Sequence, residues 1–328
     1  MRTRSLGLIV VAAVVAVVAV AAVAFGPMNL TGLTNRTPTS DKPGPGGPGP
    51  QTASPIPAPT WQVGDTWTYN TSRPDPVLTP QWGAPSSQVG SITRTVTSAS
   101  NGVYNVSITG SFHIPDLIDP TTDTPANAII LSRPTALENA SVEGYAWYRM
   151  SDLAKLKDFR LVTVSGPLWT EAGVANASFS ATVETTYSPA LDLWSFPLGE
   201  NESWNASSNA TIHASLSWHA AGPNWTWNIN WNFNATVPVK LVLTSGTAEN
   251  VTTPAGTFRA IPVRVHLAMP GPMDDHKEMA MNLGNDEAIE HRAPAELWFS
   301  GTVKGVVQAT MTIRGVRVEA VLISYHVA

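Results

Sequence analysis

The side chains whose types could bind a metal ion are gathered in one acidic segment. Residues 274–292 hold six carboxylates, two histidines and two cations, and a helix over Asp286–Arg292 would place Glu287 and His291 one turn apart on one face. Carboxylate oxygen and imidazole nitrogen are both ligands of Zn²⁺. No further ligand pattern accompanies them, so the segment is interpreted as a solvated loop between two strands. A weak Ca²⁺ or Zn²⁺ site at Glu287 and His291 is the alternative.

Signatures of covalent or cofactor-dependent catalysis are missing from the chain. There is no Gly-x-Ser-x-Gly nucleophile turn, no phosphate-binding P-loop and no dinucleotide-binding fingerprint. A net charge of −5, with 13% charged residues, also excludes a basic nucleic-acid-binding face as the main feature. We therefore expect no cofactor and no catalytic residues. A hydrolase whose site the sequence does not reveal is the alternative class.

The most regular pattern is an alternation of aromatic and polar residues over 224–234. Alternate residues of a strand share a face, so the asparagines of this segment would lie opposite its aromatic residues. The aromatic face is interpreted as packed core, because large rings on the buried side of a sheet need no other explanation. The alternatives are the lining of an apolar ligand groove and a platform for stacking on sugars. The candidate ligand-binding residues are Trp225, Trp227, Trp231 and Phe233.

Asparagine-linked glycosylation is the clearest indication of where the protein is located. Twelve of the nineteen asparagines begin an Asn-x-Ser/Thr triplet without proline in the middle. An oligosaccharide on asparagine requires this triplet and passage through an export pathway, so the pattern predicts an exported glycoprotein. The candidate positions are Asn29, Asn35, Asn70, Asn105, Asn139, Asn176, Asn201, Asn205, Asn209, Asn224, Asn234 and Asn250.

The N-terminus predicts a membrane anchor. Leu6–Phe25 is a run of twenty uncharged residues. At about 1.5 Å per residue, such a helix matches a hydrocarbon core of about 30 Å. Arg2 and Arg4 precede it, which predicts a single pass of the cell membrane with the N-terminus cytoplasmic and the remainder extracellular. The small residues around Ala24 make signal-peptide cleavage and secretion the alternative.

These patterns divide the chain into a transmembrane segment over 1–25, a linker over 26–60 and a folded domain over 61–328. The linker is rich in Pro and Gly and cannot bury a core, so we expect it to be disordered. The chain has no cysteine, so the domain must be stabilised by a large core rather than by disulfides. Similar Gly-acidic-to-Trp sequences at 61–67 and 196–204 indicate two similar halves.

Strand-forming runs dominate the folded domain. Residues 89–98 and 103–112 are joined by Ala99-Ser-Asn-Gly102, which is a hairpin signature. Only Ser151–Phe159 and Lys277–Leu283 are predicted as short helices. We expect one large, mainly β, antiparallel domain.

Three motifs lie along the folded domain: the opening strand Trp61–Tyr69 (WQVGDTWTY), the turn Thr253–Phe258 with the strand-forming run to His266, and the segment Glu296–Gly305. They resemble those of exported prokaryotic proteins, especially archaeal ones, of the LolA/LppX-like half-barrel type. The resemblance implies a strongly curved antiparallel sheet whose concave apolar face is covered by short helices and holds acyl chains, and it implies no catalytic residues. The chain departs from this pattern by lacking a lipid-modified cysteine and by its acidic insertion before Glu296.

Together these features predict a non-catalytic cell-surface glycoprotein that binds an apolar or amphipathic, lipid-like ligand or has a structural role in the envelope. The alternative is a carbohydrate-binding or adhesive module that uses an exposed tryptophan row. A deep apolar cavity would favour lipid, whereas exposed indoles would favour sugar.

Overall fold

The computed structural model describes seven stretches of the chain. Outside them lie the predicted anchor Leu6–Phe25, most of the linker, the acidic residues 274–292, and the candidate sites Asn29 and Asn35. Among the described residues, no helix is long and apolar enough to cross a membrane. The described stretches are 54–72, 88–113, 139–170, 173–222, 224–267, 295–313 and 316–328.

The regular structure in these stretches is β-strand. Buried and exposed residues alternate along most strands, as expected for a sheet that buries one face. The strands are β1 (Thr66–Ser72), β2 (Gln88–Ser100), β3 (Val103–His113), β4 (Asn139–Arg149), β5 (Lys155–Thr170), β6 (Gly173–Leu191), β7 (Ser203–Gly222), β8 (Trp225–Ser245), β9 (Glu249–Thr253), β10 (Gly256–Leu267), β11 (Ala295–Ser300), β12 (Gly305–Ile313) and β13 (Val316–His326).

The strands form one antiparallel sheet that closes on itself. Neighbours follow chain order from β1 to β8, β13 pairs with β1, and β10 pairs with both β8 and β11. Twelve strands therefore make a closed barrel, while β9 pairs with β10 outside the ring. The predicted half-barrel is wrong in this respect, because β10 joins the two edges that a half-barrel would leave free.

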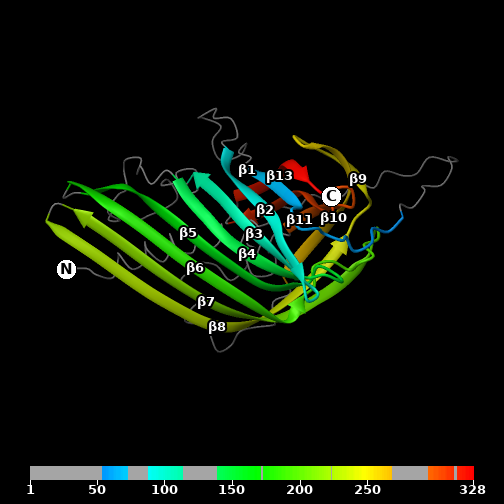
Figure 1. Cartoon of the computed structure of the whole chain (residues 1–328), viewed down its shortest axis with the longest axis horizontal. Coiled ribbons are helices and arrows are strands. Elements are labelled where there is room, and N and C mark those ends of the chain that lie inside the picture. Colours follow the sequence, from blue (N-terminus) through cyan, green and yellow to red (C-terminus); the bar gives the residue numbers. More distant parts are fainter. Residues whose placement is uncertain are drawn as a thin grey trace, which may run out of the picture.

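Closure is confined to one end of the barrel. β8 pairs with β10 only over Leu241–Ser245, whereas among the described strands its first part, 225–240, pairs only with β7. The long strands β5–β8 extend beyond the closed part as an open sheet, which occupies the left of Figure 1. This open part contains the aromatic segment that the sequence pattern singles out.

The hairpin predicted at Ala99–Gly102 is confirmed. β2 ends at Ser100, β3 begins at Val103, and the two residues between them, Asn101 and Gly102, have positive φ angles of 52° and 74°. A two-residue hairpin turn requires this left-handed backbone, which asparagine and glycine adopt most easily.

The helix predicted over Ser151–Phe159 is wrong, and no helix is found elsewhere in the described residues. A turn begins at Met150 and β5 begins at Lys155. The carboxylate of Asp152 fixes the turn by accepting hydrogen bonds from the Ala154 amide at 3.0 Å and from Arg149 Nε at 2.9 Å. A side chain that bonds to neighbouring backbone in this way competes with helical hydrogen bonding. The helix predicted over 277–283 lies outside the described residues.

Two of the motifs that carry the family resemblance meet where the first and last strands join. The Trp61 indole donates to Lys304 O at 2.8 Å, and the Trp67 indole donates to Val303 O at 2.7 Å. The buried carboxylate of Asp65 accepts a hydrogen bond from the Ala328 amide at 2.9 Å. These bonds hold β1 and the residues before it against the β11–β12 turn and the C-terminal residue, so the motif residues have a structural role at this junction.

Candidate functional site

The predicted aromatic row lies on β8 in the open part of the sheet, and most of it is exposed. Trp227, Trp231 and Phe233 are 46%, 50% and 40% exposed, and Trp225 is half-buried. The ring centroids are 5.2 Å apart for Trp225 and Trp227 and 5.6 Å apart for the stacked Trp231 and Phe233. The interpretation of this row as packed core is therefore wrong. Among the described strands only β7 pairs with this part of β8, so nothing described covers its outer edge.

The aromatic row is continuous with the apolar inner face of the sheet. Residues directly opposite one another in neighbouring strands share a face. Trp231 is opposite Leu216 of β7, Leu216 is opposite Ala181 of β6, and Ala181 is opposite Val162 of β5. The last three residues are buried in the core. An apolar stripe thus crosses four strands and leads from the exposed rings into the barrel interior.

A cluster of buried charges lies one inward-facing position further along the strands. In the next set of directly opposite residues, Phe233 of β8 is connected across β7 to Val183 of β6, and Val183 is opposite Arg160 of β5. Arg160 is 5% exposed. Arg160 Nη1 lies 2.7 Å from Asp158 Oδ1, and Asp158 also pairs with the buried Lys155. Burial lowers the pKa of Arg160, although the charge of Asp158 opposes this effect. One carboxylate therefore binds two cations in the interior.

Tyrosines surround these charges. Arg94 Nη2 donates a hydrogen bond to the Tyr148 hydroxyl at 2.7 Å. Burial raises the pKa of Tyr69 to about 12, although the charge of Arg94 opposes it. Burial also raises the pKa of Tyr187, which interacts electrostatically with Asp158 and whose hydroxyl has no hydrogen-bond partner among the described residues. A buried hydroxyl without a partner is uncommon and needs an explanation.

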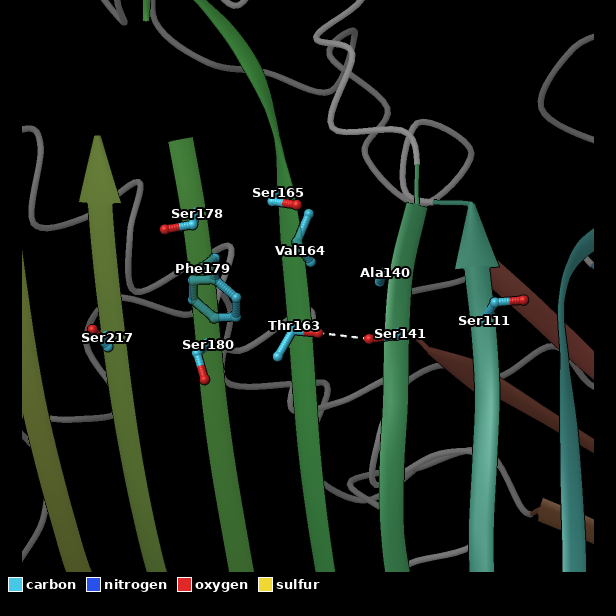
Figure 2. A pocket seen from close by; sticks show the side chains of 10 residues that line it. All are labelled: Ser111, Ala140, Ser141, Thr163, Val164, Ser165, Ser178, Phe179, Ser180 and Ser217. Atoms are coloured by element: carbon cyan, nitrogen blue, oxygen red, sulfur yellow. Dashed lines mark hydrogen bonds between the residues drawn. The ribbon is translucent and has the colours of Figure 1, made fainter. Parts of the chain in front are cut away.

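The outer face of the open part of the sheet is mainly polar. An open hollow of about 370 Å³ lies over β3–β7 and is lined mainly by serine and threonine. Figure 2 shows its lining side chains, among which Ser141 and Thr163 are joined by a hydrogen bond of 2.6 Å. A second hollow of about 450 Å³ is lined by polar residues that include Glu184, His213 and Asn234, and also by Phe233 of the aromatic row. Neither hollow is the deep apolar cavity that a lipid groove predicts, and the apolar surface that the open part of the sheet exposes is mainly the aromatic row of β8.

The candidate glycosylation sites within the barrel strands lie on the outer face. Most of these asparagines alternate with buried residues that point inward, as Asn105 does between Tyr104 and Val106. The neighbours of Asn234 are not buried, and its place on the outer face follows from its position opposite His213 in the register. Asn70 and Asn105 are half-buried. The side chain of Asn139, like all of Asn29 and Asn35, lies outside the described part. The exposed candidates are Asn176, Asn201, Asn205, Asn209, Asn224, Asn234 and Asn250.

The predicted metal site is not tested by the structure, because Glu287 and His291 lie outside the described residues. Within the described stretches, no group of three or more His, Cys, Asp or Glu side chains is arranged to hold a metal ion. The metal site stays a prediction.

The sequence pattern does not single out the buried charges, although a signal exists. Lys155 and Asp158 fall in the segment interpreted as a helix, which hides the alternation. In a strand, Asp158, Arg160, Val162 and Val164 share one face. Two charges at the end of an otherwise apolar strand face are the signal that would identify the cluster.

Comparison with known proteins gives little further guidance. No family model and no curated protein matches the chain. Among solved structures, the chain is similar to an exported protein with a YmcC-like fold from Bacteroides fragilis. The sequence identity is 11% and the TM-score is 0.32, and the match covers 83% of this chain and 100% of that chain. A likeness this low supports no argument about this protein.

Proposed function

We propose that this protein is an exported, membrane-anchored, non-catalytic glycoprotein that binds an amphipathic, lipid-like ligand on the inner face of its sheet. The observation that carries the proposal is the exposed row of Trp227, Trp231 and Phe233, which continues in register into the apolar interior. Large exposed apolar patches on folded domains typically mark binding surfaces.

The apolar stripe suits a hydrocarbon chain. From Trp225 to Phe233 the strand advances by about 27 Å, at about 3.4 Å per residue, so the rings present an extended contact line. Each methylene group removed from water contributes about 0.8 kcal/mol. A chain lying across β8 and β7 would therefore gain affinity with its length and would cover the indoles that are now exposed.

The buried charges suit a polar head group at the inner end of the stripe. Phe233 lies in the same cross-strand row as Arg160, and Tyr187 interacts electrostatically with Arg160. A head group with a hydrogen-bond acceptor would satisfy the Tyr187 hydroxyl. The interior thus offers an apolar approach followed by a polar end, which is the pattern of an amphipathic molecule.

The remaining features fit the same assignment. The predicted anchor Leu6–Phe25 and the linker would hold the domain at the extracellular surface of the membrane. Glycans on the outer face would leave the inner face open to a ligand. The sequence resemblance to LolA/LppX-like proteins, and the archaeal surface origin that it suggests, point to the same ligand class.

Native mass spectrometry of the full-length protein, produced in a host that attaches N-linked glycans, tests the proposal. We expect bound mass that is released as lipid on denaturation. Trp231→Ser should reduce this mass about tenfold, which corresponds to a loss of about 1.4 kcal/mol. Trp147→Ser is the matched control, because Trp147 is 39% exposed but lies on the outer face. An empty wild-type protein, or equal retention by both variants, would contradict lipid binding.

Carbohydrate binding is the second candidate. Trp227 and Trp231 are each about half exposed and could stack on sugar rings, and exposed indoles are the feature expected of a sugar-binding surface. We rank lipid first because the exposed rings continue in register into the apolar interior. In that case tryptophan fluorescence should change when polysaccharide is added, and the change should disappear in a Trp227→Ser/Trp231→Ser double variant. Absence of bound lipid together with this response would replace the lipid proposal.

A further inference from the structure

An aromatic platform lies on the outer face of β4 and β5, opposite to the proposed ligand surface. The Tyr145 ring stacks with Phe159 at 5.3 Å and with Trp147 at 5.9 Å between centroids, with interplanar angles of 20° and 29°. Lys157 Nζ lies 5.2 Å from the centroid of the Trp147 ring. Trp147 nevertheless remains 39% exposed. We call Tyr145, Trp147, Lys157 and Phe159 the outer platform.

The outer platform is held in place from several sides. Lys157 pairs with Glu184 of β6 at 2.9 Å, and the hydrogen bond that Lys157 donates to this carboxylate raises the pKa of Lys157. β4 and β5 are both hydrogen-bonded to strands on either side. A ring fixed in this way loses little conformational freedom when it is contacted, so Trp147 offers a preorganised surface.

A candidate glycosylation site is the immediate neighbour of this surface. Asn105 of β3 is directly opposite Trp147 in the register, and such pairs have Cβ atoms about 4.5–5.5 Å apart. Lys157 is opposite Trp147 on the other side. The indole therefore stands between an anchored ammonium group and the asparagine that begins Asn105-Val106-Ser107.

We propose that the first sugars of a glycan on Asn105 lie on the exposed indole of Trp147, so that the outer platform binds the protein's own carbohydrate. A pyranose ring presents C–H groups on one face, and these carry partial positive charge that is attracted to the negative face of an indole. The sugar hydroxyls can also reach Lys157 and Glu184. The inference rests on the glycosylation part of the proposed function and is independent of ligand binding on the inner face.

Asn209 provides a matched comparison on the same face. Its neighbours in the register are Ser188 and Pro238, so a glycan there has no aromatic ring directly opposite. Asn209 is exposed and begins a triplet of the same kind. Removal of its glycan should therefore not depend on Trp147.

Thermal unfolding of full-length protein from a glycosylating host tests the inference, with the occupancy of Asn105 measured by glycopeptide mass spectrometry. Asn105→Gln should lower Tm by about 2–4 °C, which is the shift that one contact of ordinary strength produces in a domain of this size. In a Trp147→Ala background the same change should lower Tm by less than about 1 °C, because the partner ring is gone. Ser107→Ala, which removes the triplet but keeps Asn105, should behave like Asn105→Gln.

The control is the Asn209 variant, measured in the wild-type and Trp147→Ala backgrounds. Asn209→Gln should shift Tm equally in both backgrounds. Equal effects of Asn105→Gln in the two backgrounds, or an Asn105 that carries no glycan, would overturn the inference. Trp147→Leu repeats the test if the alanine variant folds poorly. Lipid measured in the same samples reports separately on the inner face, so failure of ligand binding and failure of the glycan contact are distinguishable.

Discussion

Asp158 is the carboxylate on which the buried charges of the barrel interior depend. It pairs with Arg160 at 2.7 Å and also with Lys155, and all three residues are buried. At an effective dielectric constant of about 20, a pair at this 2.7 Å separation attracts by about 6 kcal/mol before the cost of desolvation is subtracted. The change Asp158→Asn removes the shared negative charge and leaves both cations in the interior.

Breaking a buried ion pair in this way costs about 3–5 kcal/mol. We therefore expect the free energy of unfolding of Asp158→Asn to fall by this amount, and Tm to fall by roughly 10 °C. Urea denaturation measures the loss as a lower midpoint at an unchanged slope, because the surface exposed on unfolding is the same.

Glu184→Gln is the matched control. Glu184 pairs with Lys157 at 2.9 Å on the outer face, where the two side chains are 35% and 20% exposed. Partly exposed pairs of this kind contribute about 0–1 kcal/mol, so the control should lose far less stability. A loss below about 1 kcal/mol for Asp158→Asn, or equal losses for both variants, would show that the interior around Lys155 and Arg160 is hydrated and would refute the reasoning.

Two further changes test other parts of the structure. Tyr187→Phe should stabilise the ligand-free protein by about 1–3 kcal/mol in urea denaturation, because it removes a buried hydroxyl that lacks a hydrogen-bond partner among the described residues. A loss of stability would show that this hydroxyl is hydrogen-bonded. Partial burial raises the pKa of Asp152, but hydrogen bonds from Arg149 and Ala154 outweigh it and hold that pKa below its ordinary value. The stability that Asp152 contributes is therefore present at neutral pH and lost in acid, below about pH 4. The difference in unfolding free energy between wild type and Asp152→Asn should shrink as the pH is lowered, and a constant difference would contradict this.

The hairpin between β2 and β3 could be predicted because its signal is local. Asn101 and Gly102 adopt positive φ at low cost, and the alternating residues on either side need no distant contact to favour strands. The error at Ser151–Phe159 has the opposite origin. Its residues tolerate a helix, but Asp152 fixes a turn and the chain then pairs with β4 and β6.

The candidate site was only half predictable. Alternation over 224–234 correctly placed Trp225, Trp227, Trp231 and Phe233 on one face of a strand. Whether that face is covered depends on β10, which pairs with β8 only over Leu241–Ser245. Strand alternation is a property of consecutive residues, whereas exposure is a property of which other strand arrives at the edge.

Consecutive residues alone establish that this is a mainly β chain with an aromatic face on one strand, because both features depend on the period of the sequence. They also predict an N-terminal anchor from composition and a glycosylated exterior from short Asn-x-Ser/Thr triplets. Tertiary pairing alone decides that the sheet is a closed barrel, that Arg160 lies in the cross-strand row of Phe233, and that Asn105 lies opposite Trp147. Hydrogen-bond register joins residues that are far apart in the chain, and no local pattern specifies it.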